Sequence, residues 1–202
     1  MGHRFAELAF TPSVKALQEK NGSRRSYARM EGGPPMRHRL SDREVQFITA
    51  RDSFYMATVS ETGWPYIQHR GGPAGFLRVL DEKTIGFADL SGNRQYISTG
   101  NLSGNDRVSL FLMDYANRAR LKILGRACVV PPDEAETMAR LAVDAPEARI
   151  ERGVLIDVEA FDWNCSQHIT ERYTLAEVEE ATATLRARIA ALEARLQREQ
   201  TG

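Results

Sequence analysis

Three cationic side chains alternate along one short stretch of the sequence. In a β-strand, successive side chains point to opposite faces, so Arg118, Arg120 and Lys122 would share one face, opposite Ala119 and Leu121. Three cations in line repel one another unless solvent or a bound anion compensates their charge. The stretch therefore predicts either an anion-binding strand face or the solvated outer face of an edge strand.

Two further polar clusters could bind an anion. Residues 89–95 (Asp-Leu-Ser-Gly-Asn-Arg-Gln) are expected to form a loop entering a helix over residues 93–101, with Arg94 at the helix start. A helix N-terminus favours a phosphate, and arginine can bind one bidentately. The alternative is an ordinary N-cap by Ser91 or Asn93. In residues 69–72 (His-Arg-Gly-Gly), glycine permits close backbone approach to a ligand, although an isolated arginine there would normally be a surface residue.

The common catalytic and metal-binding motifs are absent from the sequence. It has no GxSxG elbow, no HExxH, no paired CxxC, and no glycine-rich dinucleotide or Walker loop. Cys165 and His168 form a single CxxH pair, and a zinc site needs about two more ligands, so no metal site is predicted. A cysteine–histidine nucleophile stays open as an alternative, beside the ordinary role of a free cysteine as a small buried hydrophobe.

Short β-strands with few helices between them surround the polar clusters. We predict strands at residues 54–59, 65–68, 76–80, 84–88, 107–113, 119–130 and 154–161. We predict helices at residues 8–21, from the Ser-Asp-Arg-Glu capping box at 41–44 onward, and after Pro131-Pro132 up to Val143. This spacing indicates an antiparallel barrel and not a doubly wound parallel sheet.

The C-terminal segment carries an uninterrupted heptad seam. Its positions are spaced 3-4-3-4-3-4: Leu175, Val178, Thr182, Leu185, Ile189, Leu192 and Leu196. Isoleucine at an a position between leucines at d positions favours a two-stranded parallel coiled coil, and Arg188 at g could pair with Glu193 at the next e. The alternative is a helix packed on its own barrel, although such a helix normally has a broader apolar stripe.

The composition is that of one ordinary globular domain with an appendage. The 202 residues are 42% hydrophobic, and 27 basic residues balance 27 acidic ones, which argues against nucleic-acid binding by bulk charge. No apolar run approaches the ~20 residues that cross a bilayer, the N-terminus has no signal-peptide pattern, and two cysteines are too few for a disulfide framework. We therefore expect a soluble cytoplasmic protein that binds neither nucleic acid nor membrane.

In their order and spacing, these motifs resemble the pyridoxamine 5′-phosphate oxidase-like family of FMN-binding split β-barrels. The resemblance covers roughly residues 41–167. It rests on residues 63–66 (Gly-Trp-Pro-Tyr), 68–70 (Gln-His-Arg), 86–89 (Gly-Phe-Ala-Asp), 91–95 (Ser-Gly-Asn-Arg-Gln), 107–111 (Arg-Val-Ser-Leu-Phe) and 120–127, and the tail at 162–169 is similar to that of a bacterial subgroup of FMN-binding proteins. It implies a mainly β fold, an antiparallel split barrel with flanking helices, and a homodimer with FMN at the subunit interface.

The resemblance also implies a division of the chain and a set of FMN contacts. Residues 1–40 would be an N-terminal helix and arm, 41–170 the FMN-binding barrel, and 171–202 the heptad helix. Residues 68–71 and 87–88 would follow the isoalloxazine and ribityl chain, and residues 93–94 would bind the phosphate, with asparagine at the first position where the family usually has a basic residue. The full implied set is Gln68, His69, Arg70, Gly71, Phe87, Ala88, Asn93, Arg94, Gln95, Arg120, Trp163 and Asn164.

The function that the resemblance implies is that of an FMN-dependent oxidoreductase acting on an unidentified small molecule. The arginine and histidine set with which the true oxidase binds pyridoxamine phosphate has no match near this C-terminus. No general acid or base is assigned, although His69 and Tyr27 are candidates to line the open face of the ring. Residues 23–27 either cover a partner's site or form a basic linker.

A flavin-binding or redox-sensing protein without turnover is the alternative function. A haem-binding relative is disfavoured by only four histidines and no haem signature.

Overall fold

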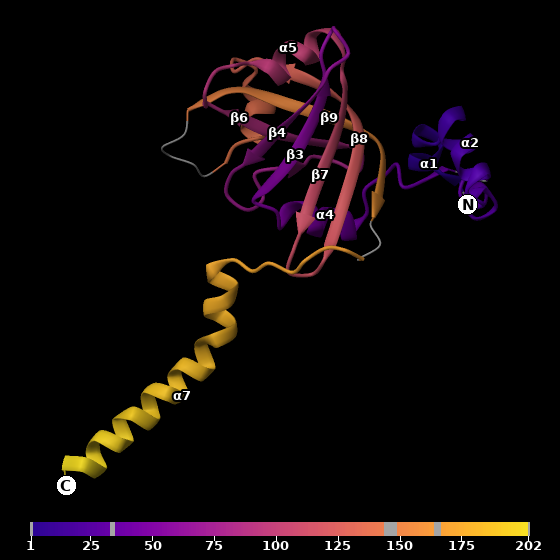
Figure 1. Ribbon diagram of the computed structural model, residues 1–202. Coiled ribbons are helices and arrows are strands. Elements are labelled where there is room, and N and C mark those ends of the chain that lie inside the picture. The colour runs from indigo at the N-terminus through magenta and orange to yellow at the C-terminus, as the bar shows by residue number, and fades with distance from the viewer. Residues whose placement is uncertain (1, 33–34, 144–148, 164–166, 202) are drawn as a thin grey trace. The chain divides into compact units, whose positions relative to one another are not determined.

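The computed structural model describes residues 2–32, 35–143, 149–163 and 167–201. They divide into two compact units, one of residues 1–114 with 119–165 and one of residues 115–118 with 166–202. The first unit contains a seven-stranded antiparallel sheet with the order β4-β3-β7-β8-β9-β6-β5 (Figure 1). The strands are β3 (Ser53–Val59), β4 (Pro65–Gly71), β5 (Arg78–Val79), β6 (Thr84–Leu90), β7 (Arg107–Asp114), β8 (Ala119–Val130) and β9 (Ile150–Trp163). The predicted mainly β, antiparallel split-barrel fold is confirmed.

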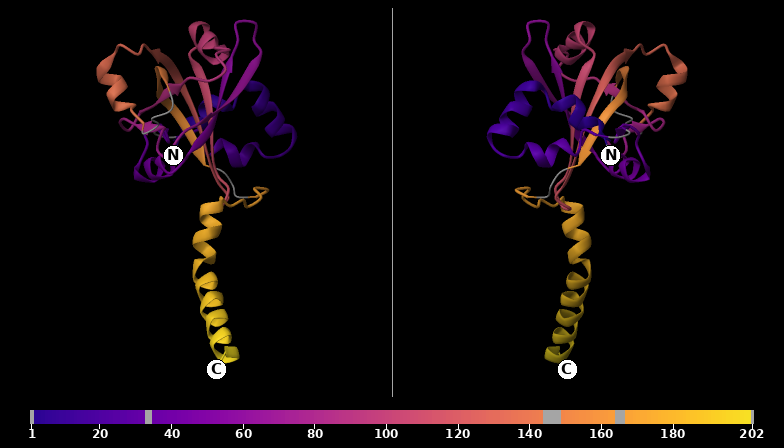
Figure 2. Two further views of the ribbon diagram at one scale, coloured as in Figure 1. Left: turned by 90° about the vertical axis from the view of Figure 1, so that its left-hand side faces the viewer. Right: turned by 90° about the vertical axis from the view of Figure 1, so that its right-hand side faces the viewer.

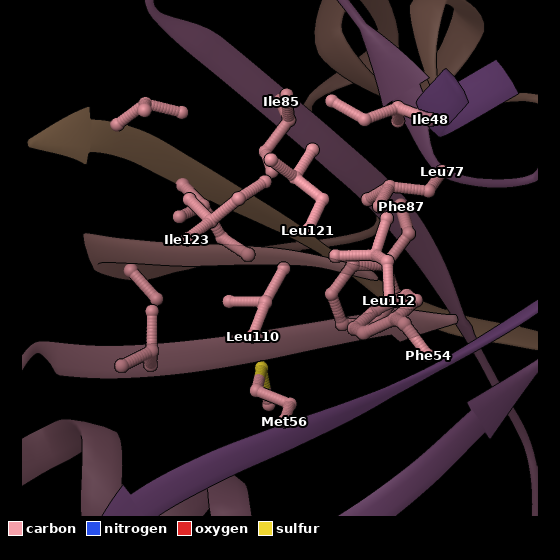
Figure 3. Close-up of a cluster of buried hydrophobic side chains, with 14 of the residues drawn as sticks. Ile48, Phe54, Met56, Leu77, Ile85, Phe87, Leu110, Leu112, Leu121 and Ile123 are labelled. Atoms are coloured by element: carbon pink, nitrogen blue, oxygen red, sulfur yellow. The ribbon is translucent and has the colours of Figure 1, made fainter. Parts of the chain in front are cut away.

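The barrel core is filled by side chains at every second position of the strands. Phe54 and Met56 of β3, Leu110 and Leu112 of β7, and Leu121 of β8 are almost completely buried (Figure 3). Their neighbours on the same strands point outward, which is the period-two alternation on which the strand predictions rest. Burial of these large apolar side chains is the main stabilising contribution to the barrel.

The sheet does not close completely around the barrel. β4 forms one edge, and at the other side β5 pairs only with Ile85 and Gly86 of β6. In the part of the chain that the structure describes, residues 87–90 of β6 pair with β9 on one side and with no strand on the other. The barrel is therefore split between β4 and the second half of β6.

Two helices lie at opposite ends of the barrel, as Figures 1 and 2 show. α4 (Asp42–Thr49) begins at the predicted capping box, in which Ser41 N donates to Glu44 Oε2 (3.0 Å). α5 (Ile97–Gly104) lies at the other end, next to the split. A short α6 (Ala135–Arg140) replaces the helix that was predicted to extend to Val143.

The N-terminal region forms three short helices where one was predicted. They are α1 (Arg4–Ala9), α2 (Pro12–Lys20) and α3 (Arg24–Ala28), and β1 (Gly2–His3) pairs in parallel with β2 (Pro35–Met36). Thr11 caps α2, with Oγ1 accepting from Val14 N (3.4 Å), so this helix begins there and does not include Leu8. α1 packs on β9, and Arg4 Nη2 lies 3.8 Å from Glu159 Oε2. The prediction of one helix over 8–21 is therefore wrong.

The strand predicted at residues 76–80 is also mostly wrong. Gly75 has φ +80° in the turn that follows Pro73, and Phe76 N donates to Pro73 O (2.9 Å). Phe76 and Leu77 are buried in the core from this turn, so only Arg78–Val79 remains as β5. The apolar residues that suggested a strand are core residues of a turn.

The second unit consists mainly of α7 (Leu175–Thr201). Its start is capped reciprocally, because Thr174 N donates to Glu177 Oε2 (2.7 Å) and Glu177 N donates to Thr174 Oγ1 (3.2 Å). Arg118 belongs to this unit and to a turn, with φ +50° and an ion pair to Glu171 (3.3 Å), so it does not continue the predicted cationic strand face. Among the described residues, no helix combines the length and apolar character that crossing a bilayer requires.

Candidate functional site

Two cavities adjoin at the split of the barrel, with volumes of about 240 and 190 Å³. The residues common to both linings come from β4, from β6 and from the loop after β6: Gln68, Arg70, Asp89, Leu90 and Gly92. Because side chains from both edges of the split line both cavities, the site exists where backbone pairing stops. The first cavity extends toward the start of α5, and the second extends along β4 and β6.

Side chains connect the two edges of the split in place of backbone hydrogen bonds. Arg70 of β4 forms an ion pair with Asp89 of β6, and both side chains are nearly buried. Ser98 of α5 donates through Oγ to Gln68 Oε1 (2.7 Å), which holds the helix against β4. The alternation along β4 turns Gln68 and Arg70 to the side opposite His69, so these two residues become the polar wall of the site.

Asp89 is the centre of a chain of buried charges. Arg152 Nε lies 3.5 Å from Asp89 Oδ2, and Arg152 Nη2 donates to Glu151 Oε2 (2.5 Å). The hydrogen bond from Arg152 lowers the pKa of Glu151 below its ordinary value, against the opposing effect of desolvation. Arg70 Nε is buried and has no hydrogen-bond partner among the described residues. The carboxylates therefore neutralise two arginines and fix them in place.

The loop before α5 differs from its prediction. Arg94 and Tyr96 have φ of +57° and +55°, values that an α-helix does not accommodate, so the helix begins at Ile97 and not at Asn93. Asn93 Oδ1 accepts from Gln95 N (3.2 Å), which stabilises a turn in the loop. The sequence showed the polar residues of this loop but not its left-handed conformations.

Arg94 nevertheless lines the first cavity, together with the first turn of α5. Arg94 Nε donates to Tyr96 Oη (2.9 Å), and this bond raises the pKa of Arg94. Arg152 stacks on the Tyr96 ring at 4.9 Å. Tyr96 as N-cap residue makes no side-chain capping bond, so no cap side chain occupies the first N–H groups of α5, which lie beside Arg94.

The structure brings together nine of the twelve predicted cofactor-binding residues in the linings of these two cavities. They are Gln68, His69, Arg70, Gly71, Phe87, Ala88, Asn93, Arg94 and Gln95. Arg120 and Trp163 line neither cavity, and Asn164 lies outside the described residues.

Arg120 and Trp163 have other surroundings. Arg120 lies over the Phe111 ring (5.3 Å) on the outer side of the sheet. Trp163 packs against α4: Nε1 donates to Glu44 Oε1 (2.7 Å), and Arg43 lies over the indole at 4.2 Å. Within one chain, these two residues are not part of the site at the split.

The two candidates for the open face of the ring are also separated. His69 packs edge-to-face on Tyr55 (5.5 Å) and lines the second cavity. Tyr27 lies in α3, edge-to-face with Phe10 (5.5 Å), and lines neither cavity. The basic segment around Tyr27 is thus a short helix in this structure.

Several lining residues were not predicted. Tyr66 shares a strand face with Gln68 and Arg70, so period-two geometry was sufficient to find it. Asp89 adjoins the predicted Ala88, and Ser98 follows the predicted Gln95 after Tyr96 and Ile97. For both residues the sequence indicates only an element, a strand end for Asp89 and a helix for Ser98. Glu151 reaches the site from β9, and only the tertiary pairing of β9 with β6 brings it there. Among the described residues, no three His, Cys, Asp or Glu side chains form a metal-binding group.

The sequence model of one family, described as pyridoxamine 5′-phosphate oxidase, matches residues 40–163, which is more than half of the chain. The chain belongs to the pyridoxamine 5′-phosphate oxidase family. The matched segment begins just before the Ser41 capping box and ends with β9, so it covers the barrel and both cavities. No curated protein matches the chain.

Solved structures resemble the barrel at low sequence identity. HupZ from Group A Streptococcus is 16% identical with a TM-score of 0.50, and the match covers 66% of this chain and 100% of that one. A putative pyridoxamine 5′-phosphate oxidase from Lactobacillus delbrueckii is 19% identical with a TM-score of 0.48, covering 63% of this chain and 99% of that one. An FMN-binding protein from Syntrophomonas wolfei is 12% identical with a TM-score of 0.47, covering 73% of this chain and 97% of that one. At these identities the likeness concerns the fold.

Proposed function

We propose that this member of the pyridoxamine 5′-phosphate oxidase family binds FMN in the two adjoining cavities and acts as an oxidoreductase on a small molecule. The observation that carries the proposal is that the barrel split gathers nine residues implied by the family resemblance, including a cationic loop at a helix N-terminus. When bound, FMN supplies the hydride or electron transfer, and the protein supplies anchoring, orientation and electrostatic tuning.

The phosphate group fits the first cavity. Arg70 and Arg152 have carboxylate partners within 4 Å, whereas Arg94 has no carboxylate that close among the described residues, although the charge of Glu151 helps to raise its pKa. Ile97, Ser98 and Thr99, the first residues of α5, line the same cavity. A phosphate between Arg94 and the helix start would receive charge-assisted hydrogen bonds from both.

The ribityl chain and the ring fit the second cavity. Its lining combines the polar Gln68, His69 and Arg70 with the apolar Phe87 and Ala88. The buried, unpartnered Arg70 Nε offers a donor to an oxygen or nitrogen of the ligand. A Cβ at Gly71 would lie only 3.1 Å from His69 Cε1, so glycine keeps the imidazole close to the backbone at the cavity wall.

We further propose that the protein is a homodimer whose second copy completes the site. The outer side of the sheet carries exposed apolar residues: Tyr55 lies opposite Phe111, and Ile67 lies opposite the partly buried Ala57. An apolar patch of this kind on a sheet favours association. Arg120 borders it over Phe111, and we assign the contacts of Arg120 and Trp163 to the flavin of the second copy.

The direct test is the absorption spectrum of the purified protein and the mass of the ligand that heat releases. We expect a yellow protein with one FMN per chain, stabilised by added FMN by ~2.7 kcal/mol at 100-fold excess over Kd. A colourless protein whose melting temperature ignores FMN would refute the proposal, and a Soret band would indicate haem. Oxidation of NADH or NADPH by the flavin-loaded protein distinguishes an enzyme from a flavin-binding protein without turnover.

A further inference from the structure

The apolar seam of α7 is exposed in the described chain. Leu175, Leu185, Ile189 and Leu196 are between 56% and 82% exposed, and Val178 and Leu192 are only about half covered. A helix with such a stripe on one side needs a surface that covers it, because leucine side chains left in water forgo the stabilisation of burial. We propose that α7 pairs with α7 of a second copy as a parallel, in-register coiled coil.

The seam has the chemistry of a two-stranded coil. Ile189 and Leu196 take a positions and Leu185 and Leu192 take d positions, which is the arrangement that favours two parallel strands. Thr182 at an a position donates through Oγ1 to Val178 O (2.7 Å), so its hydroxyl is satisfied within its own helix and its methyl group can pack in the seam. The stripe ends at Leu196, because the next d position is Glu199, which pairs with Arg195 on the same helix (2.9 Å).

The flanking charges are compatible with the parallel orientation. In a parallel coil, a g residue faces the following e residue of the other helix, so Arg188 faces Glu193, and two-fold symmetry forms this attractive pair twice. The other g–e′ pairs, such as Ala181 with Arg186 and Arg195 with Gln200, contain no like charges. The parallel register is therefore free of electrostatic repulsion.

One antiparallel register brings like charges together. In it, Leu185 of one helix meets Ile189 of the other and Leu175 lies opposite Glu199, while g residues face g residues and e residues face e residues. Arg188 then faces Arg188, Arg186 faces Arg186, and Glu179 faces Glu193. Like-charge pairs disfavour this register relative to the parallel one. The antiparallel register shifted by one heptad pairs Glu179 with Arg186, but it leaves Leu196 beyond the seam of the other helix. Only the parallel arrangement covers all seven seam positions and forms attractive flanking pairs as well.

Site-directed crosslinking of the full chain tests the orientation. In a Cys128→Ser, Cys165→Ser background, Leu185→Cys places two thiols face to face in a parallel coil, and we expect most chains to crosslink under mild oxidation, since a disulfide needs Cα atoms within about 7 Å. The matched control, Ala194→Cys on the outer f position, should not crosslink even if the barrels already hold two copies together. Circular dichroism confirms that each variant retains the helix. Failure of Leu185→Cys to crosslink, or crosslinking only in a mixture with Ile189→Cys chains, would overturn the proposal.

Charge reversal gives a second test, measured as the crosslinking rate of the same thiols. Adding Glu193→Arg to the Leu185→Cys chain places arginines opposite each other in the parallel register, so crosslinking should slow severalfold at low salt. Adding Arg188→Glu as well should restore the original rate. In the antiparallel register that pairs Leu185 with Ile189, Glu193→Arg would instead replace the repulsion with Glu179 by attraction. An unchanged rate in the single variant would overturn the parallel register, and flavin titration of the same variants reports separately on the proposed cofactor site.

Discussion

Arg94 differs from the two other arginines at the split in what its guanidinium contacts. Asp89 and Glu151 neutralise Arg70 and Arg152, whereas the Tyr96 hydroxyl is a neutral partner for Arg94. Arg94 has no ion pair within 4 Å among the described residues, although the charge of the nearby Glu151 contributes to its raised pKa. An arginine held in this way beside uncapped helix N–H groups is suited to bind a dianion. At the scale of single residues, two arginines hold the split together, and we propose that the third binds the ligand.

Replacing Arg94 by alanine should weaken FMN binding by about one to two orders of magnitude, because a charge-assisted hydrogen bond contributes roughly 1.5–3 kcal/mol. Riboflavin has no phosphate and should lose far less affinity. Flavin titration by fluorescence quenching measures both ligands. Arg140→Ala, at an exposed arginine of α6, is the control and should change neither affinity.

The contrast with Arg120→Ala sharpens this experiment. If Arg120 contacts the ring or ribityl part, its loss should weaken FMN and riboflavin alike. An equal loss of the two affinities in Arg94→Ala would show that Arg94 supports the fold of the site or contacts the isoalloxazine ring. Another cationic side chain would then bind the phosphate.

Tyr96→Phe tests whether the phenol orients Arg94. The variant removes the acceptor of the Arg94 Nε bond and keeps the ring on which Arg152 stacks. The donor of this bond is charged and such a bond contributes roughly 1.5–3 kcal/mol, so the FMN dissociation constant should rise by up to about one to two orders of magnitude, and by no more than in Arg94→Ala. Riboflavin affinity and melting temperature should stay unchanged. If both ligands weaken together, Tyr96 serves the general structure of the loop and does not position Arg94.

Among the elements, α4 is joined to the end of β9 through one carboxylate. Glu44 is nearly buried and accepts hydrogen bonds from Ser41 at the helix start and from Trp163 Nε1. Burial by itself raises the pKa of Glu44, and the bonds from Ser41 and Trp163 outweigh it and leave the pKa below its ordinary value. The same residue thus caps the helix and orients Trp163.

This arrangement predicts a pH dependence. Because the folded pKa of Glu44 is lowered, its contribution to stability is present above the unfolded pKa of about 4.3 and is lost as pH falls through the folded value. Glu44→Gln should therefore lower the free energy of unfolding at pH 7 by about 0.5–2 kcal/mol and flatten its decrease on the acid side. Urea unfolding at several pH values measures this. Asp42→Asn, an exposed residue of the same helix, is the control, and an equally steep acid limb in Glu44→Gln would contradict the assignment.

The sequence is sufficient to predict elements that local chemistry determines. The capping box at Ser41 and the bounds of β8 agree with the structure, because cap residues mark the start of α4 and turn residues mark the ends of β8. The start of α5 could not be predicted, since it depends on left-handed conformations at Arg94 and Tyr96, residue types that rarely adopt them. Glu151 reaches the cavities only through sheet pairing, and the pairing of β9 with β6 is a property of the whole barrel.

At the scale of the whole molecule, association should have two separable sources, the outer sheet face and α7. A chain lacking residues 174–202 should fold and remain dimeric, because the core residues of the barrel lie within the first unit. In that shortened chain, Ile67→Asp should give monomers with weakened flavin binding, since Ile67 is 65% exposed in one copy and its loss costs little folding energy. Light scattering measures the mass.

The control for this experiment is Leu17→Asp in α2, which is 59% exposed and lies outside the sheet face. It should leave the shortened chain dimeric. An insoluble shortened chain would mean that the seam residues of α7 pack on the barrel, and the coiled-coil proposal would then be wrong. A dimeric Ile67→Asp chain would move the proposed interface to another face.

The split of the barrel has a consequence for the solubility of the newly folded chain before it binds a cofactor. Along β4, alternate backbone N–H and C=O groups point away from β3, and residues 87–90 of β6 present a second unpaired edge. Bare strand edges are templates on which another chain can add a strand, the usual first step of aggregation. A flavin lying along both edges would cover them. We therefore expect the supply of cofactor to set the yield of soluble chain, with riboflavin-starved cells accumulating it in inclusion bodies.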